Sequence, residues 1–239
     1  MARVDVRGVI IPNSYKWYYD WFEEDSTCPR DVQKVIDALC PGETLDVYVN
    51  SPGGVIESGS EIYTMLRALP DGAVKIHITG EACSAASVIS MGGWAEMAPT
   101  ALMMVHCVSS GVIGNHNDME HMAEVLRTAD QALCTAYMDK AGMTKAQALE
   151  MMEHETWLTA QQAKDKGLID AVMFEEADAQ EDIPLVAGPM FRLPTMEQME
   201  RVKALMAGQE APPEPAVDHK ALNTARASLE LLGLQRRTM

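Results

Sequence analysis

Long apolar runs are missing from this sequence. None of its 239 residues belongs to a run approaching the roughly 20 apolar residues that a membrane-spanning helix needs. The first residues also lack a basic segment followed by an apolar stretch, which is the pattern of a secretory signal. We therefore expect a protein without membrane contact and with a cytoplasmic location.

Paired cysteines and metal-ligand spacings are missing as well. The five cysteines contain no C-x-x-C pair and leave one without a partner, which predicts reduced thiols rather than disulfides. No two histidines have a spacing such as H-E-x-x-H. We therefore expect no metal and no other cofactor.

Basic residues are scarce in this chain. Lysine and arginine total 19 against 35 aspartate and glutamate residues, and the formal net charge is −16. A protein of this charge repels phosphate groups. Nucleic acid is therefore not expected as a partner.

The residues that are present favour a globular α/β domain. Apolar residues make up 47% of the chain, enough to bury a core. Short apolar strands alternate with amphipathic helices, which predicts a layered α/β fold of repeated ββα units with a helical C-terminal appendage. Near Asp178 the composition changes, so we expect one domain over 1–177 and an extension over 178–239 with a linker and amphipathic helices. The expected strands are 4–11, 45–49, 74–79, 94–97 and 102–106, and the main expected helices are 58–69, 84–92, 118–141 and 146–152.

Aromatic residues are few, and they are concentrated in one segment. They account for 5% of the chain, yet six of the thirteen lie between Tyr15 and Phe22. Helical spacing relates four of them, Tyr15, Tyr18, Tyr19 and Phe22. Two interpretations stay open: an amphipathic segment packed on the core, or a subunit-contact surface.

Small residues follow the expected strand at 74–79. Residues 80–87 read GEACSAAS and suit the start of a helix. A serine at a tight strand-to-helix junction has an exposed hydroxyl beside free backbone N–H groups, as an acyl-transferring nucleophile requires. Ser84 is the predicted nucleophile, and the Ala85 N–H is a predicted oxyanion donor. Cys83 is the alternative nucleophile, although thiols of this kind are more often packing residues.

A glycine-rich segment follows the expected strand at 45–49. Residues 50–54 read NSPGG, which predicts a turn. Two glycines permit positive φ and the close approach of a ligand. We predict that the Gly53 N–H is the second oxyanion donor and that Gly54 contacts the substrate.

A general base is the remaining requirement. Among the six histidines, His106 ends the expected strand at 102–106, where strand packing would fix its ring in a cleft. A carboxylate must then orient the imidazole. Glu155 and Glu153 both lie just before the helix cap at Thr159, and either one fits by chemistry alone.

Four segments, in order, resemble the Clp protease proteolytic subunit family, the ClpP-type serine peptidases. The similarity covers about residues 1–175 and implies a ClpP/crotonase-like fold and a serine endopeptidase. In such an enzyme Ser84 is the nucleophile and His106 the base. The N–H groups of Gly53 and Ala85 surround the oxyanion. The matching segments are YVNSPGG at 48–54, GEACS at 80–84, MMVH at 103–106, and ETWLTA at 155–160 followed by GLID at 167–170.

The resemblance also bears on the triad carboxylate and the substrate groove. The family usually has Asp at the position of Glu155, so the resemblance implies that Glu155 completes the triad with a longer side chain. The segment after His106 is shorter than in the housekeeping family. It still suits an edge strand for an extended peptide, and the implied contacts are Ser109, Ser110 and Gly111.

The aromatic N-terminal segment, the ETWLTA motif and the C-terminal extension are similar to the phage and prophage branch of the family. That branch implies a head-maturation (prohead) protease acting on capsid or scaffold proteins, in the host cytoplasm or the prohead. The family also implies a homo-oligomeric ring with inward-facing active sites. No clear docking element for an ATP-dependent unfoldase is evident, so that partner stays open.

Two rival functions stay open. A crotonase-type enzyme acting on acyl-CoA also pairs two backbone N–H groups, but it usually has glycines where this chain has AAS at 85–87. A catalytically silent capsid-assembly or scaffold component would fit the C-terminal helices and the change to Glu155. The complete set of serine, histidine and oxyanion elements favours the peptidase.

Overall fold

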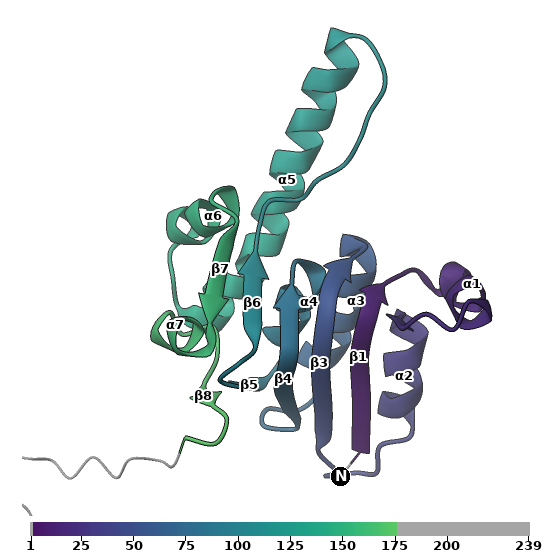
Figure 1. Cartoon of the computed structure of the whole chain (residues 1–239), viewed down its shortest axis with the longest axis vertical. Helices are drawn as coiled ribbons and strands as arrows, with labels where there is room; N and C mark the ends of the chain where they lie inside the picture. Colours follow the sequence, from purple (N-terminus) through teal and green to yellow (C-terminus); the bar gives the residue numbers. More distant parts are fainter. Residues whose placement is uncertain (1, 176–239) are drawn as a thin grey trace, which may run out of the picture. The chain divides into compact units, whose positions relative to one another are not determined.

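A sheet of eight strands forms the centre of the structure (Figure 1), a computed structural model that describes residues 2–175. The strands are β1 (Ala2–Ile10), β2 (Ser26–Thr27), β3 (Leu45–Gly54), β4 (Val74–Cys83), β5 (Trp94–Met97), β6 (Leu102–Val105), β7 (Thr156–Thr159) and β8 (Ala171–Val172). The main path runs β2-β1-β3-β4-β5-β8, and β6 pairs with β4 and β7. All pairs are parallel except β6 with β7.

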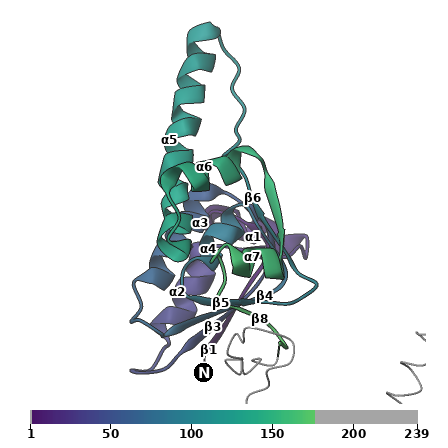
Figure 2. The same cartoon turned by 90° about the vertical axis from the view of Figure 1, so that its left-hand side faces the viewer.

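Helices cover one face of this sheet, as the edge view shows (Figure 2). Parallel neighbours need long crossover connections, which explains why helices separate the strands. Completely buried core residues on β3, β4 and α4 include Val47, Ile76 and Ile89. The predicted layered α/β fold is confirmed. The helices are the 3₁₀ turn η1 (Asn13–Tyr15), α1 (Lys16–Trp21), α2 (Pro29–Asp37), α3 (Ile56–Arg67), α4 (Ala85–Ser90), α5 (His116–Ala141), α6 (Lys145–Glu153) and α7 (Ala160–Asp165).

The expectation of a turn at 50–54 is wrong. These residues are the end of β3, where Gly53 pairs with Val9 and Gly54 with Ile10 after a shift in register. The Ser51 hydroxyl donates to Gly8 O at 2.6 Å and fastens the shifted stretch to β1. Pairing with β1 therefore keeps this segment extended, although its composition is typical of a turn. β4 likewise continues past the expected end at Thr79, because its last residues pair with β6.

The aromatic segment forms η1 and α1, and it is not packed on the core. Tyr15 is 59% exposed, Tyr18 48% and Phe22 56%, and no residue of α1 is buried. Of the two interpretations, core packing is wrong for these side chains. The subunit-contact interpretation stays a prediction.

The long helix α5 leaves the sheet with its N-terminal half (Figure 1). Asn115 caps this end by accepting from the Asn117 N–H at 2.9 Å, and Gly142 ends the helix with a φ of 65°. Like the other helices within residues 2–175, α5 is not apolar enough to cross a membrane. The extension expected at 178–239 lies outside the described residues.

Candidate active site

Ser84 is the one-residue junction between β4 and α4. Its φ of 54° and ψ of −123° lie in a region where a residue with a side chain is strained. Two bonds hold the junction: the Ser84 N–H donates to Met104 O at 2.9 Å, and the Ser87 N–H donates to Ser84 O at 2.9 Å. A sharp strand-to-helix turn of this kind exposes the hydroxyl at the C-terminal end of its strand.

Two glycines make room for this junction. A Cβ on Gly53 would lie 2.7 Å from Ser84 Cβ, and one on Gly59 would lie 2.9 Å from Ala85 Cβ. Carbon atoms do not approach this closely without repulsion. The φ of +97° at Gly53 also favours glycine. Glycine at 53 therefore lets the backbone of β3 come close to the Ser84 hydroxyl.

His106 directly follows β6 and faces Ser84. β6 lies beside the end of β4, with Cys83 opposite Met104, which carries the next residues of β6 past the junction. His106 Nε2 lies 2.8 Å from Ser84 Oγ. At this distance the hydroxyl donates to Nε2 when the ring is neutral with its proton on Nδ1. The structure brings together the predicted nucleophile and the predicted base.

Glu155, the predicted triad carboxylate, is near the histidine but not bonded to it. The antiparallel register pairs Val105 with Thr156, so Glu155 is the next residue opposite His106. Its carboxylate instead accepts from Trp157 Nε1 at 3.4 Å. Glu155 itself lies in the turn that precedes β7 and has a φ of 44°, a left-handed conformation that is strained for a residue with a side chain.

Glu153, the second candidate, is the exposed last residue of α6. Within residues 2–175 no carboxylate hydrogen-bonds to His106, and its Nδ1 has no partner there. The structure thus forms a serine–histidine pair and leaves the third group apart. The same residues also contain no cluster of three or more side chains suited to hold a metal ion.

The two predicted oxyanion donors differ in this structure. The Ala85 N–H is the first of α4 and has no partner within the helix. The Gly53 N–H donates to Ser51 Oγ at 3.1 Å. A Cβ on Gly53 would lie 3.1 Å from the Ala85 nitrogen, so the two backbone segments are close neighbours. Within the described residues the Ala85 N–H therefore has no hydrogen-bond partner, whereas the Gly53 N–H already donates to Ser51.

A buried hydrogen-bonded chain supports Ser84 from behind. The Ser87 hydroxyl donates to Ser84 O at 2.6 Å and lies 2.8 Å from Tyr137 OH. Burial of the Tyr137 phenol raises its pKa to about 12, so it stays a neutral donor to Ser87. The sequence predicted the helix at 118–141 but not this role of Tyr137, because a partner 50 residues away leaves no local signal.

Asp130 fixes the chain after the histidine, and sequence reasoning missed it. Its buried carboxylate accepts from the Val108 N–H at 2.7 Å, two residues beyond His106. The signal that could have revealed it is a charged residue between Leu126 and Leu133 on the apolar face of α5. A buried charge in such a stripe needs a specific partner.

A cavity of about 660 Å³ adjoins the site and contains part of the predicted substrate contacts. Gly54, Ser109 and Ser110 line it, whereas Gly111 does not. Residues 106–113 form no strand, so the predicted edge strand has no partner to pair with in the single chain. The predicted contacts other than Gly111 therefore surround one hollow beside Ser84.

Burial makes the neighbouring thiol unreactive. Burial, and secondarily the negative charge of Glu81, raise the pKa of Cys83 to about 12. A thiol is a good nucleophile only as the thiolate. At neutral pH the residue at this junction that can act as a nucleophile is therefore Ser84.

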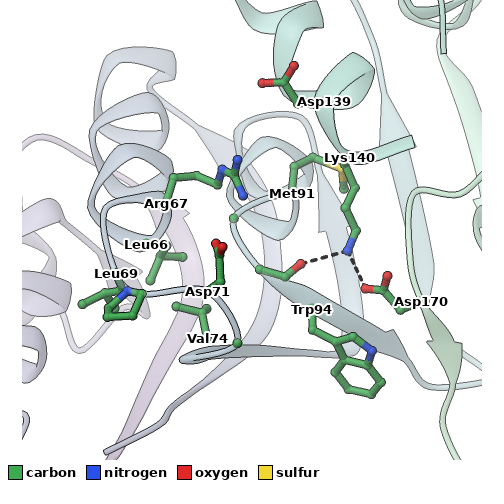
Figure 3. A pocket seen from close by; sticks show the side chains of 14 residues that line it. Leu66, Arg67, Leu69, Asp71, Val74, Met91, Trp94, Asp139, Lys140 and Asp170 are labelled. Atoms are coloured by element: carbon green, nitrogen blue, oxygen red, sulfur yellow. Dashed lines mark hydrogen bonds and ion pairs between the residues drawn. The ribbon is translucent and has the colours of Figure 1, made fainter. Parts of the chain in front are cut away.

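A second hollow, of about 280 Å³, lies away from Ser84 (Figure 3). It is lined by Val74, the first residue of β4, whereas Ser84 follows the last. There Lys140 donates to Gly93 O at 2.9 Å and pairs with Asp170. These bonds hold the C-terminal end of α5 in place. The residues that line this hollow therefore stabilise the fold and do not take part in the chemistry.

Comparison with known proteins places this geometry in a family. The family model described as Clp protease matches residues 32–176, more than half of the chain. The chain belongs to the Clp protease family. The ATP-dependent Clp protease proteolytic subunit of Bacteroides fragilis is 30% identical over 144 residues, which cover 59% of this chain and 69% of that protein. The ATP-dependent Clp protease proteolytic subunit 1 of Chlamydia abortus is 28% identical over 144 residues, which cover 58% and 74%.

The Clp protease family match includes the whole of the described site and omits the N-terminal elements. Ser84, His106 and Glu155 all lie within 32–176. β1, η1 and α1 precede the matched stretch.

Proposed function

We propose that this chain is a serine endopeptidase of the ClpP type. The observation that carries the proposal is the 2.8 Å contact between Ser84 Oγ and His106 Nε2 at a strained strand-to-helix junction. Membership of the Clp protease family supports it. The raised pKa of the Cys83 thiol supports serine over cysteine as the nucleophile.

The proposed reaction is acyl transfer through Ser84. Its hydroxyl oxygen attacks the carbonyl carbon of the scissile peptide bond while His106 takes the proton. The Ala85 N–H stabilises the negative oxygen of the tetrahedral intermediate. His106 then gives its proton to the leaving amine, and an acyl group remains on Ser84. A water molecule, deprotonated by the same ring, releases the acid and restores the hydroxyl.

Two small movements complete the site in this proposal. The Glu155 side chain moves from Trp157 to His106. There its carboxylate accepts from the Nδ1–H, which fixes the tautomer protonated on Nδ1 and stabilises the imidazolium that forms during the reaction. The Gly53 N–H leaves Ser51 Oγ and becomes the second donor to the oxyanion. The Glu155 carboxylate gains the positive charge that develops on the imidazole, and the Gly53 N–H gains the negative charge that develops on the oxyanion. Hydrogen bonds to charged groups are stronger than those to neutral ones, which favours both movements.

We infer that the substrates are phage capsid or scaffold proteins, as in head maturation. The support is the resemblance of the exposed aromatic segment and of the ETWLTA motif at 155–160 to the phage branch. The same resemblance supports a homo-oligomeric ring with inward-facing sites, and a location in the host cytoplasm or the prohead. We assign no ATP-dependent partner to this chain.

Hydrolysis of a casein-derived fluorogenic peptide tests the proposal. Ser84→Ala and His106→Ala should each lower kcat/KM by on the order of 10³-fold or more, since they act as one unit. Ser60→Ala, a serine on α3 outside the site, is the matched control and should keep the wild-type rate. Equal rates in Ser84→Ala and the wild type would rule out Ser84 as the nucleophile.

A silent capsid-assembly component is the second candidate. The observation in its favour is that His106 Nδ1 has no partner among residues 2–175. Co-expression with the capsid protein of the same phage separates the two functions. The peptidase shortens the capsid or scaffold protein, which intact mass detects, and Ser84→Ala prevents the cut. Intact proteins in both cases favour the silent component. The family match argues against the acyl-CoA enzyme.

A further inference from the structure

The carbonyl of Ser84 belongs to the same peptide group as the Ala85 N–H, the proposed oxyanion donor. Three groups donate to this carbonyl oxygen: the Ser87 N–H at 2.9 Å, the Ser87 hydroxyl at 2.6 Å and the Val88 N–H at 3.3 Å. The two N–H contacts are those of an ordinary helix start, where one carbonyl is often shared. The hydroxyl contact depends on the side chain at position 87, and it is the shortest of the three.

The Ser87 hydroxyl is itself held by a phenol from α5. Ser87 donates its one hydroxyl proton to the Ser84 carbonyl, so the Tyr137 hydroxyl, 2.8 Å away, is the donor in the contact between the two side chains. Ser87 is completely buried and Tyr137 is 2% exposed. Burial raises the pKa of Tyr137 to about 12, which keeps the phenol protonated at neutral pH. A directed chain of hydrogen bonds therefore runs from Tyr137 through Ser87 to the Ser84 carbonyl.

A hydrogen bond to a peptide carbonyl changes the N–H group of the same peptide. It draws electron density toward the carbonyl oxygen and leaves the N–H more positive, which is how hydrogen bonds in a chain strengthen one another. Each donor to the Ser84 carbonyl thus makes the Ala85 N–H a better donor to a negative oxygen. The same contacts fix the plane of the peptide and so the direction of its N–H bond. An oxyanion is stabilised best by donors that are oriented before the reaction begins.

We propose that Ser87 and Tyr137 are positioning residues of the oxyanion site, whose hydrogen-bonded chain polarises the Ser84–Ala85 peptide and directs the Ala85 N–H at the negative oxygen of the tetrahedral intermediate. The inference rests on the proposed peptidase function. Both side chains are buried, so they act on the substrate only through this peptide. Their removal should therefore weaken binding of the transition state and leave binding of the substrate unchanged.

Steady-state hydrolysis of the casein-derived peptide separates these two effects. Ser87→Ala should lower kcat about tenfold and Tyr137→Phe about fivefold, with KM within about twofold of the wild type. These losses are smaller than the roughly 10²–10³-fold that removal of a whole oxyanion donor causes, because the Ala85 N–H itself remains. The midpoint of the pH–rate profile should stay the same in both variants, since the contact of His106 with Ser84 Oγ is not part of the chain.

Ser90→Ala is the matched control. Ser90 lies on the same helix, is also completely buried and also donates to a backbone carbonyl, that of Ala86, at 2.9 Å. This bond polarises the peptide between Ala86 and Ser87, which is not the one that carries the proposed donor. The variant loses a bond of the same kind and should keep kcat within about twofold. A loss equal to that of Ser87→Ala would contradict a specific role of the Ser84–Ala85 peptide.

A peptide boronic acid measures the oxyanion site without turnover. Ser84 Oγ bonds to boron, the hydroxyl proton passes to His106, and boron becomes a tetrahedral anion with an oxygen at the oxyanion position. Its Ki should rise in each variant by the factor by which kcat falls. The double variant should match Ser87→Ala in both quantities, because Tyr137 acts only through Ser87. Should Ser87→Ala fail to fold, Tyr137→Phe, which removes a single oxygen atom, gives the answer.

Three results would overturn the inference and leave the peptidase proposal standing. They are an unchanged kcat and Ki in Tyr137→Phe, a rise of KM in place of the fall in kcat, and a shifted midpoint of the pH–rate profile, which would assign the pair to the histidine. A wild-type protein that hydrolyses no peptide, and that reacts with neither the boronic acid nor a fluorophosphonate, overturns the proposed function itself.

Discussion

The Ser84 hydroxyl depends on neighbours that hold its backbone in a strained turn. The Ser84 carbonyl accepts from Ser87 Oγ at 2.6 Å, and Ser87 Oγ in turn lies 2.8 Å from Tyr137 OH. Buried polar groups whose hydrogen bonds are all satisfied hold their surroundings rigid. These contacts offset the strain of the positive φ and keep the hydroxyl directed at His106.

Replacing the carboxylate of Glu155 tests its proposed role at the histidine. Glu155→Gln should lower kcat by on the order of 10²–10⁴-fold, because an amide neither stabilises the imidazolium nor enforces the tautomer. Glu153→Gln is the comparison variant and should leave kcat within about twofold, since Glu155 rather than Glu153 directly precedes the strand that pairs with β6 before His106. Steady-state kinetics on both variants gives the answer, and the opposite pattern would make Glu153 the third group.

Alkylation of the cysteines tests the electrostatics beside Ser84. At pH 8 iodoacetamide should modify the exposed Cys40 and leave Cys83 unmodified, because burial raises the Cys83 pKa to about 12 and the thiolate is scarce. As pH rises toward 12 the thiolate fraction of Cys83 grows, so its modification should increase with pH. Peptide mass mapping measures both sites. Modification of Cys83 as fast as Cys40 at pH 8 would contradict this result.

At the scale of elements, a histidine joins three strands on the sheet face that the helices leave uncovered. His77 on β4 has Nε2 at 2.8 Å from Asp46 on β3 and Nδ1 at 2.7 Å from Glu96 on β5. Both ring nitrogens face carboxylate oxygens, so the ring links Asp46 and Glu96 across the strand between them. Tyr48 stacks on it at 4.6 Å, and Arg3 on β1 lies over the Tyr48 ring.

Removing this ring should weaken the sheet. His77→Phe leaves Asp46 and Glu96 without the hydrogen-bonding partner that they share, which costs on the order of 1–3 kcal/mol of unfolding free energy. Lys75→Ala, an exposed site on the same strand, should change it by about 0.5 kcal/mol or less. Urea unfolding measures both. Equal stability of His77→Phe and the wild type would show that these hydrogen bonds contribute little.

Local sequence predicted most elements because their signals are local. The helix cap expected at Thr159 is present and opens α7, and Gly167, which follows this helix, has a φ of 76°. The segment at 50–54 misled because its strand partner, β1, is more than 40 residues away along the chain. Ser84 and His106 were predicted from motif chemistry. Asp130 was detectable only as a charged residue in an apolar stripe, and its partner Val108 was not predictable, since that contact exists only in the fold.

At the scale of the molecule, large apolar side chains are exposed at sites distant in sequence. Trp17 and Trp21 on α1 are more than 70% exposed, and Ile113 and Met119 beside or on α5 are also exposed. Patches of this kind mark interaction sites. A second copy of the chain is the partner that the proposed ring requires.

Native mass spectrometry tests the assembly. The wild type should have several times the mass of one chain, and Trp21→Ser should lower the oligomeric fraction at micromolar concentration, because it removes an apolar contact. Glu24→Ser, an exposed polar residue beyond α1, is the control. A wild-type protein that is monomeric and fully active would contradict the ring.

The most direct measurement is the site of fluorophosphonate modification, read by peptide mass mapping. The proposed enzyme carries one adduct, on the Ser84 hydroxyl, and loses it in both Ser84→Ala and His106→Ala. An adduct on another residue, or undiminished labelling of Ser84→Ala, would contradict a nucleophile built from the β4–α4 junction and the histidine after β6.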